Sequence, residues 1–114
     1  MQLEQFLAGQ QKASWVRIPH TVDVGSVYMR KARRSFSGQM WTCLDVATIR
    51  IEKRYRRKGI FKRFLANLES MQLEQDAIYV ENVMDQWFRD WFEREGWIRH
   101  NYIKGVTCSY FKWV

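Results

Sequence analysis

A dense basic stretch, RYRRKGIFKRFL from Arg54 to Leu65, is the segment best suited to hold a charged ligand. Six of its first ten residues are Arg or Lys, and Gly59 stands among them. The stretch falls where a predicted strand ends and a predicted helix begins. A helix N-terminus offers free N–H groups and a partial positive charge, which together bind phosphate, and a glycine lets the phosphate approach closely. The sequence therefore predicts a phosphate-binding turn at residues 56–61.

A surface for a polyanion is the alternative interpretation. From Arg30 to Arg63 twelve Lys or Arg residues face only two acidic ones, within a chain of net charge +7. Such a field attracts nucleic acid, an acidic protein or a phosphorylated cofactor. Nearby aromatic residues suit base stacking, although Phe61 and Phe64 also fit the apolar face of the following helix. A solvated basic face that only aids solubility is the third interpretation.

The elements that position this turn follow from hydrophobic periodicity, which changes from strand-like to helical at Ile60. A parallel strand–helix–strand crossover is expected between Trp41 and Val83, inside a mostly antiparallel sheet. The predicted class is α/β (an α+β mixed sheet). The expected elements are a helix around Leu3–Leu7, strands Ser14–Ile18, Val24–Phe36 and Gln39–Ile51, a helix Ile60–Met71, a strand Ala77–Val83, a helix Met84–Phe92, and a closing hairpin of Trp97–Ile103 and Thr107–Val114.

Composition indicates one folded domain. A length of 114 residues supports a single core, and 46% apolar residues argue against disorder. No apolar run of membrane-spanning length and no signal-like N-terminus is present, so we expect a cytoplasmic protein without a membrane partner. The two cysteines, Cys43 and Cys108, are too few for a disulfide scaffold, and His20 and His100 lack partners at metal-ligand spacing, so no metal site is expected.

Two segments resemble the GNAT superfamily of N-acetyltransferases. The family's acetyl-CoA signature is Arg or Gln, two residues, Gly, one residue, and Gly or Ala, and here it reads Arg56 through Gly59 to Phe61. The later MDQWFRDWFEREGW resembles the family's second conserved helix, with Phe92, Gly96 and Trp97 at its end. The resemblance spans about residues 39–114, the expected acetyl-CoA-binding core, and it implies a GNAT-like fold with helices on both faces of the sheet. Residues 1–38 would be an abbreviated acceptor region.

The resemblance implies roles for named residues. The backbone amides of Arg57, Lys58, Gly59, Ile60 and Phe61 would hold the CoA pyrophosphate, with Arg56 and Lys58 adding charge. The strand end from Ile49 to Ile51 would pair with the pantetheine arm, and the N–H of Ile51 would polarise the thioester carbonyl. The implied function is transfer of an acetyl group from acetyl-CoA to an amine of a small molecule or protein, by direct attack.

Candidate acid–base residues are Glu81, Asp45 and Tyr110. Glu81 ends the strand beside the expected acyl gap, and Asp45 shares a strand face with Ile49 and Ile51 by simple alternation, although a structural ion pair is an alternative role for each. Tyr110 is a substitute acid, because the family's usual tyrosine is Phe92 here.

Departures from the family pattern keep a second function open. Phe61 replaces a small residue of the phosphate signature, and Phe92 has no proton to give. A degenerate or phage-type member without catalysis would fit these changes. Its basic middle third, Arg30–Arg63, would contact nucleic acid or an acidic protein. The sequence leaves monomer and dimer open.

Overall fold

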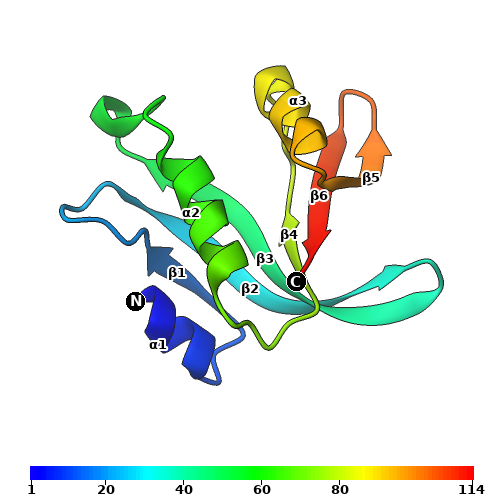
Figure 1. The fold of residues 1–114 in the computed structure, drawn as a ribbon, viewed down its shortest axis with the longest axis horizontal. Helices are drawn as coiled ribbons and strands as arrows, with labels where there is room; N and C mark the ends of the chain where they lie inside the picture. The colour runs from blue at the N-terminus through cyan, green and yellow to red at the C-terminus, as the bar shows by residue number, and fades with distance from the viewer.

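The computed structural model describes residues 1–114 as three α-helices packed on one six-stranded mixed sheet (Figure 1). The predicted order of helices and strands is confirmed, with small shifts at the element ends. None of the helices is long and apolar enough to cross a membrane. The elements are α1 (Leu3–Ala8), β1 (Ala13–Arg17), β2 (Gly25–Phe36), β3 (Gln39–Ile51), the 3-10 turn η1 (Lys53–Tyr55), α2 (Ile60–Ser70), β4 (Ala77–Val80), α3 (Gln86–Arg94), β5 (Ile98–Ile103) and β6 (Thr107–Trp113).

The long hairpin of β2 and β3 is the backbone of the sheet. Its tight turn places Ser37 and Gly38 at φ 52° and 79°, and two successive positive φ angles match the right-handed twist of the flanking strands. The register runs from Phe36 opposite Gln39 to Gly25 opposite Ile51. In Figure 1 the turn end of this hairpin projects beyond the rest of the molecule.

The sheet order is β1-β2-β3-β4-β6-β5, and β3 and β4 form its one parallel pair. Helix α2 connects these two strands, which confirms the predicted crossover. Every other neighbouring pair is antiparallel. The predicted mixed sheet is therefore confirmed.

The prediction of helices on both faces is wrong, because all three helices pack on the same side of the sheet. Leu3 and Phe6 of α1, four residues of α2 and Phe92 of α3 belong to one apolar core together with inward-facing strand residues. That core is the larger of two, and side chains of both α2 and α3 belong to it. The α2 residues are Ile60, Phe64, Leu65 and Leu68.

The opposite side, which we call the helix-free face, is covered only by its own large side chains. Cross-strand registers place Trp15, Tyr28 and Thr48 in one row and Arg30, Asp45, Tyr79 and Phe111 in another. A second, smaller apolar cluster lies here, and the Phe36 and Phe111 rings stack at 4.1 Å within it.

A β-bulge reverses the faces along β3. Tyr28 pairs with Thr48, but Met29 pairs with Val46, so Ala47 is an extra residue. Simple alternation therefore fails at this point, and Ile49 lies on the helix side while Asp45 lies on the helix-free face. The expectation that Asp45 shares a face with Ile49 and Ile51 is wrong for this reason.

Candidate functional site

The parallel strands β3 and β4 separate at one end and leave a gap. Their pairing ends at Val46 opposite Val80, and the last hydrogen bond runs from the Glu81 N–H to the Val46 carbonyl at 3.1 Å. Beyond this point β3 continues to Ile51, whereas the segment that follows β4 leaves the sheet toward α3. A pocket of about 200 Å³ lies in the opening, and we call it the gap pocket. It is lined by Val46–Ile49, Phe61, Val80–Asp85, Phe88 and Phe92.

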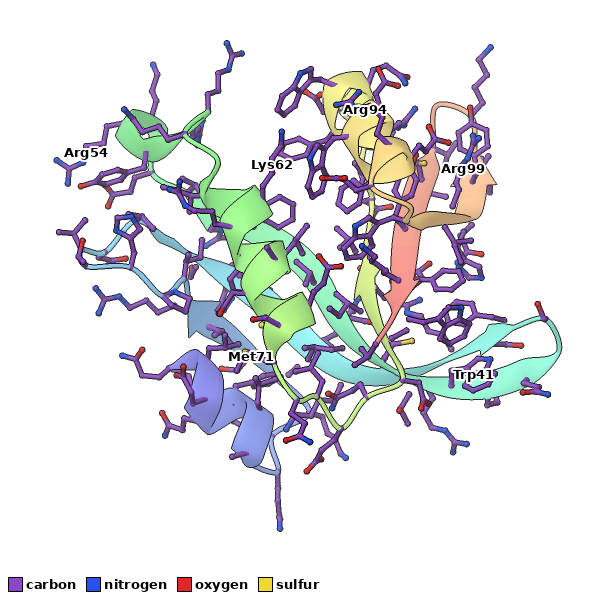
Figure 2. The ribbon with its side chains drawn as sticks, viewed as in Figure 1. Trp41, Arg54, Lys62, Met71, Arg94 and Arg99 are labelled. Carbon is purple, nitrogen blue, oxygen red and sulfur yellow. The ribbon has the colours of Figure 1, made fainter.

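Side chains of α2 and α3 meet across the mouth of the gap pocket. The Phe61 and Phe88 rings pack edge to face with centroids 5.7 Å apart. Beside them, Lys62 Nζ lies 4.0 Å from the centroid of the Trp87 ring, and Figure 2 shows Lys62 between the two helices. These contacts narrow the mouth, because both helices contribute a bulky side chain to it. Phe61 thus turns toward the core instead of standing over the preceding turn.

The β3–α2 turn carries the predicted phosphate site. Gly59 is the residue before α2 and has φ 74°, a conformation that glycine adopts without strain. The N–H groups in the first turn of any helix have no intrahelical acceptor, and here no side chain caps them either. Arg57, at φ 59°, and Lys58 are both exposed beside them. Free N–H groups, the helix dipole and two cations together favour an anion here.

The structure brings most of the predicted cofactor residues to one end of the sheet. One group lies at the gap pocket, and the other lies at the β3–α2 turn. Ile49 and Phe61 line the gap pocket, and Ile60 is buried beneath the turn. Arg56 folds back, and its Nε donates a 2.9 Å hydrogen bond to the Ile51 carbonyl. This bond ties the turn at residues 56–61, which we call the basic turn, to the end of β3, and it occupies one N–H group of the Arg56 guanidinium.

Glu81 and Asp45 take part in one four-residue ion cluster on the helix-free face. Arg34 Nη2 lies 2.7 Å from Asp45 Oδ2 and 2.5 Å from Glu81 Oε1, and Arg30 also pairs with both carboxylates. Burial raises the pKa of Asp45, and the Arg34 hydrogen bond opposes that effect. Glu81 Oε2 makes no hydrogen bond, and Glu81 also lines the gap pocket. Of the two carboxylates, Glu81 alone can act on a group held in the gap.

Tyr110 is separated from the other two candidates. It lies on the helix side of β6 and is buried, with its ring stacked on Phe92 at 5.0 Å. Burial raises its pKa, and the neighbouring Cys108 adds to this rise. Phe92 lines the gap pocket and Tyr110 does not, so the Phe92 ring separates the Tyr110 side chain from the pocket. The three predicted acid–base residues therefore do not converge.

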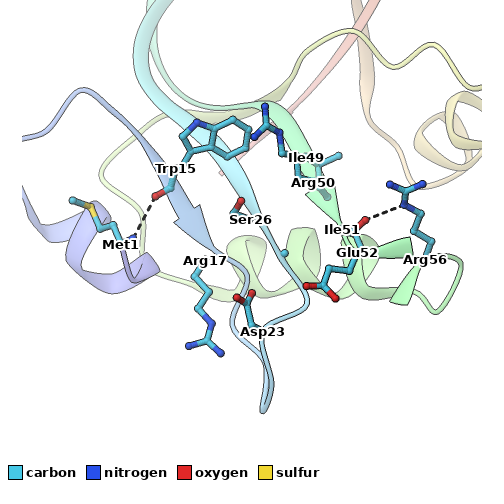
Figure 3. Close-up of a pocket in the computed structure, with 11 residues that line it drawn as sticks. Met1, Trp15, Arg17, Asp23, Ser26, Ile49, Arg50, Ile51, Glu52 and Arg56 are labelled. Atoms are coloured by element: carbon cyan, nitrogen blue, oxygen red, sulfur yellow. Dashed lines mark hydrogen bonds between the residues drawn. The ribbon is translucent and has the colours of Figure 1, made fainter. Parts of the chain in front are cut away.

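A larger and shallower cavity of about 590 Å³, the outer groove, was not predicted (Figure 3). Its walls include Trp15 and Arg17 from β1, Arg50 from β3 and Arg56 from the basic turn. Trp15 and Arg17 alternate with the buried Val16 and Ile18, which is the sequence signal that could have placed them together on the face away from the core. Arg50 could not be placed in this way, because the bulge at Ala47 intervenes.

The chain was compared with protein-family models and with curated proteins. No family model matches it, and no curated protein matches it. The function must therefore be derived from the gap pocket, the basic turn and the outer groove.

Proposed function

We propose that the chain is a GNAT-type acyltransferase, which takes an acetyl group from acetyl-CoA and passes it to an amine. The single observation that carries this proposal is the adjacency of the gap pocket to the uncapped basic turn, since Phe61 belongs to both. A thioester ligand with a pyrophosphate at its other end needs such a pair of sites: an anion cradle and a slot between two strands.

The residues supply binding and one proton transfer in this proposal. The N–H groups of the first turn of α2, with Lys58, bind the pyrophosphate, and the free edge of β3 near Ile49 binds the pantetheine arm. The amine attacks the thioester carbonyl, so a C–N bond forms and the C–S bond breaks. Glu81 Oε2 takes the proton that the amine loses. The departing thiolate takes its proton from water, because Phe92 offers none.

The second candidate function is a non-catalytic protein on the same fold. It is favoured by the Phe61–Phe88 contact, which narrows the mouth that a pantetheine arm must enter, and by Phe92 at the position of the family's acid. In that case the basic middle third, Arg30–Arg63, serves a macromolecular partner. The two candidates differ in whether the chain binds acetyl-CoA.

A thermal shift titration with acetyl-CoA tests the proposal. A ligand at ten times its Kd stabilises the folded state by about 1.4 kcal/mol, which raises the melting temperature by roughly 5 °C in a domain of this size. We expect this rise in the wild type and its loss in Gly59→Glu, where a carboxylate enters the cradle. Gly38→Glu is the matched control, because Gly38 has a similar φ of 79° and open space around it. No shift for the wild type, or an equal shift for both variants, contradicts the proposal.

Release of free CoA thiol, followed with a panel of amines, tests turnover separately. We expect release that depends on both the amine and Glu81, and Glu81→Gln should reduce its rate at least 100-fold, as is usual for loss of a general base. Acetyl-CoA binding without any amine-dependent release would favour the non-catalytic candidate.

A further inference from the structure

The outer groove lies on the helix-free face, at the same end of the sheet as the gap pocket, and it combines an aromatic side chain with arginines that form no ion pair. Trp15, Arg17, Ser26 and Arg50 all stand on this face in two adjoining cross-strand rows. Tyr28 and Thr48 complete the rows. The proposed acyl transfer uses none of these side chains, and no helix covers them.

The aromatic centre of this surface is Trp15. The Arg50 guanidinium lies 4.4 Å from the centroid of its ring, and the Tyr28 ring lies 5.4 Å from it at an angle of 55°. Trp15 and Tyr28 are half-buried and Arg50 is exposed, so their planar groups reach solvent. A planar cation stacked on an indole at the surface is an arrangement that also accepts the flat face of a nucleobase.

The charges around this centre suit a phosphodiester chain. Arg17 and Arg50 form no ion pair, and Arg17 Nε is buried without any hydrogen-bond partner. Arg56 borders the same groove and leads into the exposed Arg57 and Lys58 of the basic turn. Basic side chains therefore extend from the aromatic centre to the basic turn at one end of the sheet.

The groove walls favour single strands over duplexes. Asp23 and Glu52 line it together with the arginines, as Figure 3 shows. These carboxylates can accept hydrogen bonds from the amino groups of bases, which have no pairing partner in a single strand. A stacking ring is useful only when the bases are exposed, as they are in a single strand.

From this arrangement we propose that the helix-free face binds single-stranded nucleic acid. One base stacks against the Trp15–Arg50 pair, Arg17 and Arg50 each bind an adjoining phosphate, and the nucleic acid continues over Arg56 to the basic turn. The contacts at Trp15, Arg17 and Arg50 use none of the side chains assigned to acyl transfer, so substitutions there separate the two activities, although both proposals place an anion at the basic turn.

Fluorescence anisotropy with a labelled single-stranded oligonucleotide of about 12 nucleotides tests the proposal, since sites of this class cover roughly 4–16 nucleotides. We expect binding that weakens with salt, and weaker binding of a hairpin duplex with the same composition. Trp15→Ala should raise Kd by about 5- to 150-fold, the range that corresponds to loss of one stacked base. Arg50→Gln should lower the slope of log Kd against log salt by about 0.7, as expected for one lost phosphate contact.

Arg94→Gln is the matched control for charge. Arg94 is an exposed residue of α3 without an ion pair. Its substitution by Gln removes one positive charge, as Arg50→Gln does, but at a position far from the outer groove (Figure 2). We expect its Kd to stay within about twofold of the wild type, as for a single remote charge screened by salt. If the Trp15→Ala variant is poorly folded, the Arg50→Gln variant alone tests the proposal, because the exposed Arg50 side chain can be replaced without disturbing the core.

Three results would overturn the proposal: no binding of the single strand at low salt, equal affinity for duplex and single strand, or equal losses in Arg50→Gln and Arg94→Gln. The acetyl-CoA thermal shift of Arg50→Gln should equal that of the wild type. Failure of nucleic-acid binding and failure of acetyl-CoA binding are therefore separate outcomes.

Discussion

Arg34 donates a hydrogen bond to each carboxylate oxygen of Asp45. Its Nη2 lies 2.7 Å from Oδ2, its Nε lies 3.2 Å from Oδ1, and the Asp45 side chain is fully buried. The same guanidinium lies 3.8 Å from the centroid of the Tyr79 ring. One arginine of β2 thus shields a buried carboxylate of β3 on a face that no helix covers, and stability should depend on this pair.

Asp45→Asn should lower the free energy of unfolding by about 3 kcal/mol at pH 7, because it leaves Arg34 without its buried partner. Urea denaturation measures this change. Glu52→Gln is the control: it removes the exposed pair with Arg54 and should cost less than about 1 kcal/mol. Equal effects of the two substitutions would show that the buried cluster adds no stability.

His100 should make stability sensitive to mild acid. Burial and the charge of Arg34 lower the pKa of His100 from 6.5, and its Nδ1 lies 2.8 Å from the Tyr79 hydroxyl. As pH falls from 6.5 toward the lowered pKa, the unfolded chain binds more protons than the folded one, so the free energy of unfolding decreases. His100→Gln should lose this part of the pH dependence in melts between pH 7.5 and pH 5. His20→Gln, in an exposed loop, should retain it.

Cys43 should be inert in the folded protein. Burial, with a smaller effect of Asp45, raises the pKa of its thiol to about 11, so only about 0.1% is thiolate at pH 8. Cys108 is also buried. We expect a thiol reagent to titrate both cysteines only after denaturation, at the rate of unfolding. Reaction of Cys43 within seconds under native conditions would mean that this face of the sheet opens readily.

Phe61→Ala should strengthen acetyl-CoA binding if the proposed function is right. An aromatic pair contributes about 0.5–1.5 kcal/mol, and a ligand entering the gap must disrupt the Phe61–Phe88 contact, so its removal should lower Kd roughly 2- to 10-fold. Isothermal titration calorimetry measures the change. Trp41→Ala, which removes a half-buried aromatic ring on the β2–β3 hairpin, should leave Kd unaltered. Weaker binding in Phe61→Ala would instead mean that the ring contacts the ligand.

The local signals in this sequence were sufficient to locate its helices and strands. Ser37-Gly38 marks the hairpin turn, the change of period at Ile60 marks the start of α2, and Gly59 marks the turn before it. Each of these features depends on neighbouring residues, whose turn chemistry and hydrophobic spacing act over a few positions. The parallel pairing of β3 with β4 also followed from element order, because a strand–helix–strand unit has few alternatives.

Only the tertiary structure decided which side chains meet. The single extra residue at Ala47 moves Asp45 to the face opposite Ile49, and no sequence period announces such a bulge. The contact of Arg30 with Glu81 joins residues distant in the chain, and the outer groove combines β1, β3 and the basic turn. These arrangements depend on the pairing and packing of whole elements, so the sequence by itself determined the order of helices and strands, while the three-dimensional packing determined the sites.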